Sequence, residues 1–174
     1  MIWITTIILL FIGGGGAGGS SKSKDAGAHE RWPAGEAVVL HTTAVADGLR
    51  FCSRNSPAGI SAFWEVPARD IPAIDAALHR HLRSSGLDKQ LTLPIAKYER
   101  QFIGFSRGES RFVYIHAFAA RFLRAKFDPA KAIPRICDGG TLSWGIEYDT
   151  KARSFSAFSP NGGEDRPRAA SSPW

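Results

Sequence analysis

The sequence is poor in cysteine: it has only two, Cys52 and Cys137, and therefore allows a single disulfide pairing. Neither cysteine closely follows the apolar run at residues 2–12, which disfavours a lipoprotein. The glycine tract at residues 13–19 contains no lysine and lacks a strand-turn-helix context, so it is not a phosphate-binding loop. The chain also lacks internal repeats and any recognisable nucleic-acid-binding module, which excludes a repeat protein.

The N-terminus is unlike the rest of the chain. Residues 2–12 (IWITTIILLFI) are uncharged and have the length of a signal-peptide core, but eleven helical residues reach only about half of a bilayer's hydrocarbon thickness. We therefore predict a signal peptide or N-terminal membrane anchor at residues 1–19 and a linker at residues 20–35. No Lys or Arg precedes the run, and cleavage and tethering both stay open. The expected location is periplasmic or secreted, or tethered to the inner membrane.

Residues 36–162 are predicted to form a single α+β domain, followed by a flexible tail at residues 163–174. The clearest element is a helix at residues 68–85, where Ile71, Ile74, Leu78 and Leu82 recur at steps of three and four. Gly86 provides a left-handed end for it. Three further residues are expected in the core: Trp64, Trp144 and Tyr148.

The remaining segments favour β-structure. A strand is expected at residues 36–45, a short one at 49–53, and hairpins at 98–106 with 111–118 and at 142–148 with 155–158. Residues of both faces of the 111–118 strand are apolar, which predicts a central strand. The expected fold is a small antiparallel sheet of about four to six strands packed against one main helix.

Several groups of residues together resemble a family of small exported bacterial proteins of unknown function. They are Cys137-Asp138-Gly139-Gly140, Trp144-Gly145-Ile146-Glu147-Tyr148-Asp149 and Asn161-Gly162. His116 stands where that family usually has asparagine. The resemblance implies an exported compartment and one fold, but no activity.

Few residues suggest chemistry. Export to an oxidising compartment predicts a Cys52–Cys137 disulfide, with two buried free thiols as the alternative. Cys137 could instead be a nucleophile with His116 as its base, and Glu147 and Asp149 share one strand face as an acid-base pair would require. His79 and His81 diverge on the helix, and no metal site or cofactor is predicted.

These observations lead to two hypotheses of function. The first is a non-catalytic exported domain that acts through a protein partner in the cell envelope, with membrane contact through the N-terminal segment only if it is uncleaved. The alternative is an exported hydrolase that uses Cys137 and His116, or Glu147 and Asp149. The net charge of +6 is spread along the chain, and we expect solvated surface at residues 121–135 rather than nucleic-acid binding.

Overall fold

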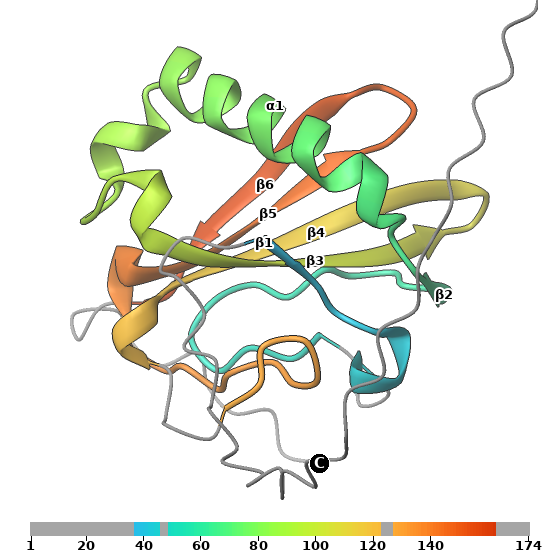
Figure 1. The fold of residues 1–174 in the computed structure, drawn as a ribbon, viewed down its shortest axis with the longest axis horizontal. Coiled ribbons are helices and arrows are strands. Elements are labelled where there is room, and N and C mark those ends of the chain that lie inside the picture. Colours follow the sequence, from blue (N-terminus) through green and yellow to red (C-terminus); the bar gives the residue numbers. More distant parts are fainter. Residues whose placement is uncertain (1–36, 46–48, 123–126, 163–174) are drawn as a thin grey trace, which may run out of the picture. The chain divides into compact units, whose positions relative to one another are not determined.

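A six-stranded sheet with one long helix on one face makes up the fold in the computed structural model, which describes residues 37–45, 49–122 and 127–162 (Figure 1). The expected signal peptide or anchor, the linker and the C-terminal tail lie outside the described residues. Within those ranges, no helix has both the length and the apolar content needed to cross a bilayer.

The helix α1 (Ile71–Ser84) confirms the prediction from periodicity. A 3-10 turn, Ala68–Asp70, leads into it, and Pro72 lies in its first turn, where a missing backbone N–H is tolerated. All four apolar residues of the predicted stripe are buried, and Leu78 is fully inaccessible. The chain leaves the helix at Gly86, whose φ of 73° is the left-handed conformation that glycine adopts without strain.

The sheet has the strand order β1-β3-β4-β5-β6, and β2 also pairs with β3. The two long hairpins are antiparallel, as predicted, but the sheet is mixed because β1 runs parallel to β3. The strand bounds are β1 Ala37–Val39, β2 Ala62–Trp64, β3 Tyr98–Arg107, β4 Ser110–Ala119, β5 Ser143–Asp149 and β6 Ser154–Pro160. Short 3-10 helices occupy Thr42–Val45, Leu87–Gln90, Ile95–Lys97, Ala120–Phe122 and Gly140–Leu142.

Two strand expectations were wrong in detail, and one strand was missed. The strand expected at residues 36–45 ends at Val39 and turns into a 3-10 helix, and residues 49–53 contain no strand. The strand β2 was not expected. The core residues were predicted well: six of the seven named are buried, and Trp64 is half-buried against the same cluster.

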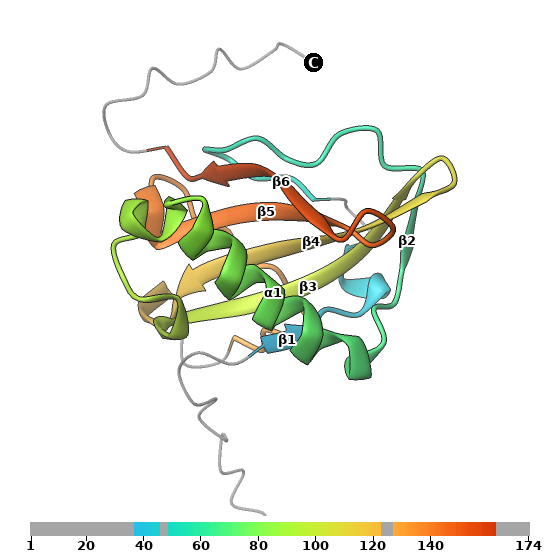
Figure 2. The same ribbon diagram turned by 90° about the horizontal axis from the view of Figure 1, so that it is seen from above.

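Each face of the sheet carries its own apolar cluster. Val113 and Ile115 of β4 pack towards α1, whereas Tyr114 belongs to the opposite cluster with Ile103 and Phe105. Figures 1 and 2 show α1 crossing one face, while irregular segments of residues 49–61 and 127–139 lie across the other. The strand β4 lies between β3 and β5, which confirms its predicted central position.

A disulfide joins the two irregular segments. Cys52 and Cys137 are bonded, with their Cα atoms 5.5 Å apart, and no free cysteine is left in the chain. The bond spans 85 residues, and the loss of denatured-state freedom for such a loop corresponds to about 4 to 5 kcal/mol of stability. The predicted pairing is therefore confirmed.

Candidate functional site

A cluster of buried polar side chains lies beneath the disulfide, and Arg54 is at its centre. Arg54 is only 8% exposed. Its Nε donates to the hydroxyl of Tyr114 at 3.0 Å, and its Nη1 donates to Ser143 Oγ at 3.0 Å and to Asn161 Oδ1 at 2.6 Å. These partners lie on β4, on β5 and just after β6. One side chain two positions after Cys52 thus attaches its segment to β4, to β5 and to the residue that follows β6.

The sequence of β5 makes room for this cluster. Gly145 lies opposite His116 of β4, and a Cβ at Gly145 would overlap the Tyr114 hydroxyl. The glycine therefore lets the Tyr114 ring cross β5 and reach Arg54. A side chain at this position would displace the phenol that accepts from the guanidinium.

Arg54 carries its charge into the core among neutral partners. Its guanidinium carbon lies 3.7 Å from the centre of the Phe51 ring, and its Nη2 is buried without a hydrogen-bond partner among the described residues. Burial lowers the pKa of Arg54, and the Tyr114 hydroxyl opposes that effect. Removing an ion from water costs several kcal/mol that neutral partners repay only in part. The surrounding structure must hold this side chain in place.

His116 continues the same network and is fully buried. Burial, and then the charge of Arg54, hold the pKa of His116 well below its usual range, so the ring is neutral at pH 7. Gln101 donates its amide N–H groups to the carbonyls of Pro129 and Ala132 at 2.6 and 2.7 Å, which leaves Gln101 Oε1 as the acceptor facing His116 Nδ1 at 3.1 Å. This arrangement assigns the proton of the neutral ring to Nδ1.

With that tautomer, His116 Nε2 is free to accept from the Ser143 hydroxyl, which lies 3.4 Å away. A hydroxyl beside an imidazole acceptor, with the other ring nitrogen oriented by a third group, is the arrangement of a nucleophile and its base. Ser143 and His116 are both fully buried, so no substrate reaches them in this conformation. In the described structure the chain of hydrogen bonds satisfies buried polar groups.

The structure does not assemble the cysteine nucleophile considered from the sequence. Cys137 is oxidised and has no thiol, and the contacts of His116 are with Gln101, Ser143 and the rings of Phe51 and Phe118. Cys137 and Cys52 are both solvent-exposed, whereas His116 is inaccessible. Nucleophilic attack requires a thiolate, so the Cys137 and His116 hypothesis lacks its reactive group here.

Glu147 and Asp149 lie on the same face of β5, as their spacing requires, but they have separate structural partners. Glu147 is 5% exposed and receives two hydrogen bonds of 2.7 Å from the guanidinium of Arg107. The hydrogen bonds to Glu147 raise the pKa of Arg107. Asp149 Oδ1 accepts the backbone N–H groups of Lys151 and Ala152, which closes the turn into β6. One carboxylate thus fixes a guanidinium and the other fixes a turn.

A further ion pair links the helix to the sheet. Arg100 of β3 donates to the two oxygens of Asp75 on α1 at 2.7 and 3.2 Å. His79 lies 3.8 Å from the same carboxylate, and burial lowers the pKa of His79. His81 instead stacks on Phe155 with ring centres 5.0 Å apart. The two histidines diverge as predicted, and the described residues contain no group of three potential ligands that could hold a metal.

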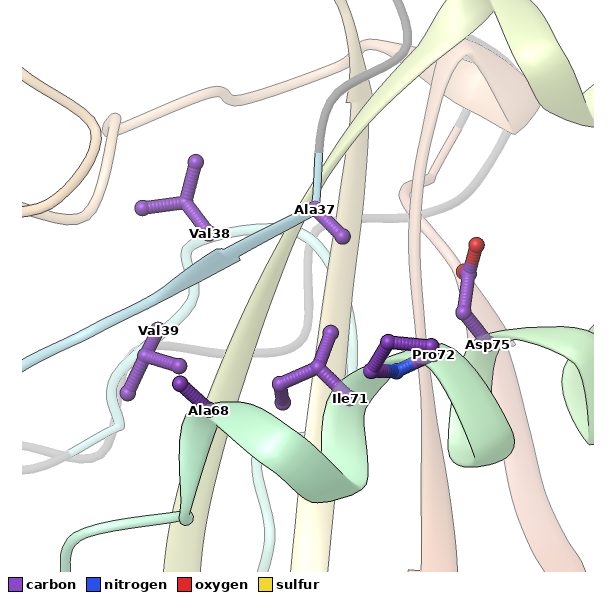
Figure 3. Close-up of a pocket in the computed structure, with 7 residues that line it drawn as sticks. All are labelled: Ala37, Val38, Val39, Ala68, Ile71, Pro72 and Asp75. Atoms are coloured by element: carbon purple, nitrogen blue, oxygen red, sulfur yellow. The ribbon is translucent and has the colours of Figure 1, made fainter. Parts of the chain in front are cut away.

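An apolar groove opens beside Asp75, between the edge strand β1 and the start of α1 (Figure 3). Its volume is about 550 Å³. Figure 3 shows the side chains of Val39, Ala68 and Ile71 facing one another across it, with Asp75 farther along the helix. The full lining is Ala37, Val38, Val39, Ala68, Ile71, Pro72 and Asp75.

Sequence reasoning missed the centre of the polar cluster. Arg54 directly precedes a turn-rich segment and resembles an ordinary surface arginine, and Asn161 resembles a turn residue. One signal was available: Gln101 and His116 interrupt the apolar alternation of two strands on the same sheet face. Two polar side chains at such positions predict a buried network with its own partners.

Comparisons with protein-family models, with curated proteins and with solved structures find no match for this chain.

Proposed function

We propose that this chain is an exported or membrane-tethered domain that binds a protein partner in the cell envelope and does not act by catalysis. The apolar run at residues 2–12 and a disulfide, which forms and persists in oxidising compartments, support the location. The internal partners of His116, Glu147 and Asp149 support a structural role for the residues that had suggested chemistry.

The observation that carries the binding proposal is the groove beside β1. Among the described residues β1 pairs on one side only, with β3, so its outer edge presents backbone groups next to an apolar hollow. An open strand edge beside a helix-lined groove suits strand addition, in which an extended segment pairs with the edge and places side chains in the groove.

The lining determines the chemistry of the partner segment. Six of the seven lining residues are alanine, valine, isoleucine or proline, and the charge of Asp75 is already matched by Arg100 at 2.7 Å. The proposed partner is therefore an extended segment of an envelope protein that carries aliphatic side chains at alternate positions. Backbone pairing supplies part of the affinity and the apolar side chains supply the selectivity.

Capture from envelope extract with the full chain tests this binding. The informative variant is Pro72→Glu, which places a carboxylate in the groove at a helix start that favours negative charge, so folding is preserved. Ala73→Glu adds the same charge one residue later, at an exposed position outside the groove lining. We expect a captured protein to be lost with Pro72→Glu and retained with Ala73→Glu. Equal capture by both variants refutes the groove as the binding surface.

Fractionation with protease protection tests the location. The full chain should resist added protease in intact cells with a sealed envelope and become sensitive when the outer compartment is opened. A product found in the cytosolic fraction, sensitive only after complete lysis, contradicts export.

A further inference from the structure

We propose that the Cys52–Cys137 disulfide is a site of thiol-disulfide exchange, and that its reduction releases the segment carrying Arg54 from the sheet. This inference concerns the face opposite α1, and it does not depend on partner binding at the groove. Both cysteines are solvent-exposed, so a thiol reductant can reach the bond. Exposed disulfides are the ones that exchange readily, whereas structural ones are shielded.

The exchange itself needs a dithiol reductant. One thiolate of the dithiol attacks one cysteine sulfur and forms a mixed disulfide, and the bonding electron pair leaves with the other cysteine as a thiolate, which takes up a proton. The second thiol of the reductant, once deprotonated, attacks the mixed disulfide and releases the first cysteine. The reductant ends as a disulfide after losing two electrons, and Cys52 and Cys137 end as thiols.

The two segments joined by this bond lie outside the regular helices and strands. Residues 49–61 and 127–139 contain neither helix nor strand. Beside the disulfide, Ser53 accepts the backbone N–H of Gly162 at 2.7 Å, and its hydroxyl accepts the backbone N–H of Asp138 at 3.1 Å. The second of these bonds joins the same two segments as the disulfide. Gln101 also holds residues 127–139 to the sheet through the carbonyls of Pro129 and Ala132. Once the covalent bond is gone, release of the other segment must break the bonds of Ser53 and the three hydrogen bonds of Arg54 itself.

The buried charge of Arg54 favours release of its segment. Its guanidinium is buried among the neutral groups of Tyr114, Ser143 and Asn161, with Nη2 lacking a partner among the described residues. Water solvates a guanidinium better than such a site does, so release of the segment restores hydration to the charge. The disulfide, two residues before Arg54, keeps the charge inside. Release would also uncover the hydroxyl of Tyr114 and the Ser143 and His116 pair.

Limited trypsin digestion of the full chain tests the release, because trypsin cuts after arginine. We expect cleavage after Arg54 to accelerate at least about tenfold when the chain is reduced and alkylated, because cleavage follows the population of the open segment. The double variant Cys52→Ser with Cys137→Ser should behave in the same way without alkylation. Arg153, in the exposed turn between β5 and β6, is the internal control and should be cut at a rate that changes less than about twofold. Oxidised glutathione should restore protection of Arg54 in the reduced, unalkylated chain.

Three results would overturn the proposal. Continued protection of Arg54 in the reduced chain shows that the segment is not released. Equal acceleration at Arg54 and at Arg100, inside β3, shows that the bond supports the whole fold and is not a local switch. A native disulfide that dithiothreitol reduces only in the presence of urea shows that the bond is not an exchange site.

Discussion

Acidification should destabilise this fold through His116. The ring is fully buried beside Arg54, and both conditions hold the pKa of His116 well below its usual range in the folded chain. In the unfolded chain the pKa returns to about 6.5, so below this pH the unfolded state binds one more proton than the folded state. Stability is therefore fully present above pH 6.5 and falls as the pH decreases.

The size of the effect follows from linkage. While His116 stays neutral in the folded state, lowering the pH from 7.5 to 5.5 reduces the free energy of unfolding by about 1.4 kcal/mol. Urea denaturation followed by tryptophan fluorescence at several pH values between these limits measures the loss. All buffers should have the same ionic strength, so that the screening of charges does not change between pH values.

The variant His116→Asn is the control, since it cannot take up a proton in this range. Burial also lowers the pKa of His79, and because His79 is present in both proteins its contribution cancels in the comparison. The difference in unfolding free energy between wild type and variant should shrink as the pH falls. Parallel pH profiles for the two proteins would refute the assignment of a buried neutral His116.

Further substitutions test the packing. Leu78→Ala, at a fully inaccessible helix position, should cost about 2 to 5 kcal/mol in urea melts, whereas the exposed Arg80→Ala should change stability by less than about 0.5 kcal/mol. Gly145→Ala should cost at least about 2 kcal/mol, because its methyl group overlaps the Tyr114 hydroxyl; unchanged stability would contradict the described crossing. Ala157→Gly should raise stability by up to about 1 kcal/mol, since Ala157 has a φ of 54°, and a loss of stability would contradict that backbone conformation.

The local elements of this fold were predictable and the distant pairings were not. The stripe from Ile71 to Leu82 and the alternation in β4 are properties of short windows, and the structure reproduces both. The strand β1 pairs in parallel with a segment about sixty residues later, and three residues carry too little alternation to indicate a partner or a direction. The β-branched pattern past Val39 predicted a longer strand, but the chain turns at Thr42 to cover the second face.

The same contrast applies to the polar cluster. The pairing of Cys52 with Cys137 could be predicted because only one combination exists. The burial of Arg54 could not be predicted, because it requires acceptors from three distant parts of the chain to meet around one guanidinium. Its burial is a consequence of tertiary structure that composition and periodicity do not contain.

Site-specific photo-crosslinking in cells that produce the full chain tests the central claim most directly. A benzophenone amino acid at position 72 lies in the groove, and the same group at position 73 is exposed outside its lining. The account predicts a defined adduct with an envelope protein from position 72, and a much weaker one from position 73. No adduct at position 72, or equal adducts from both positions, would contradict partner binding in the groove beside β1.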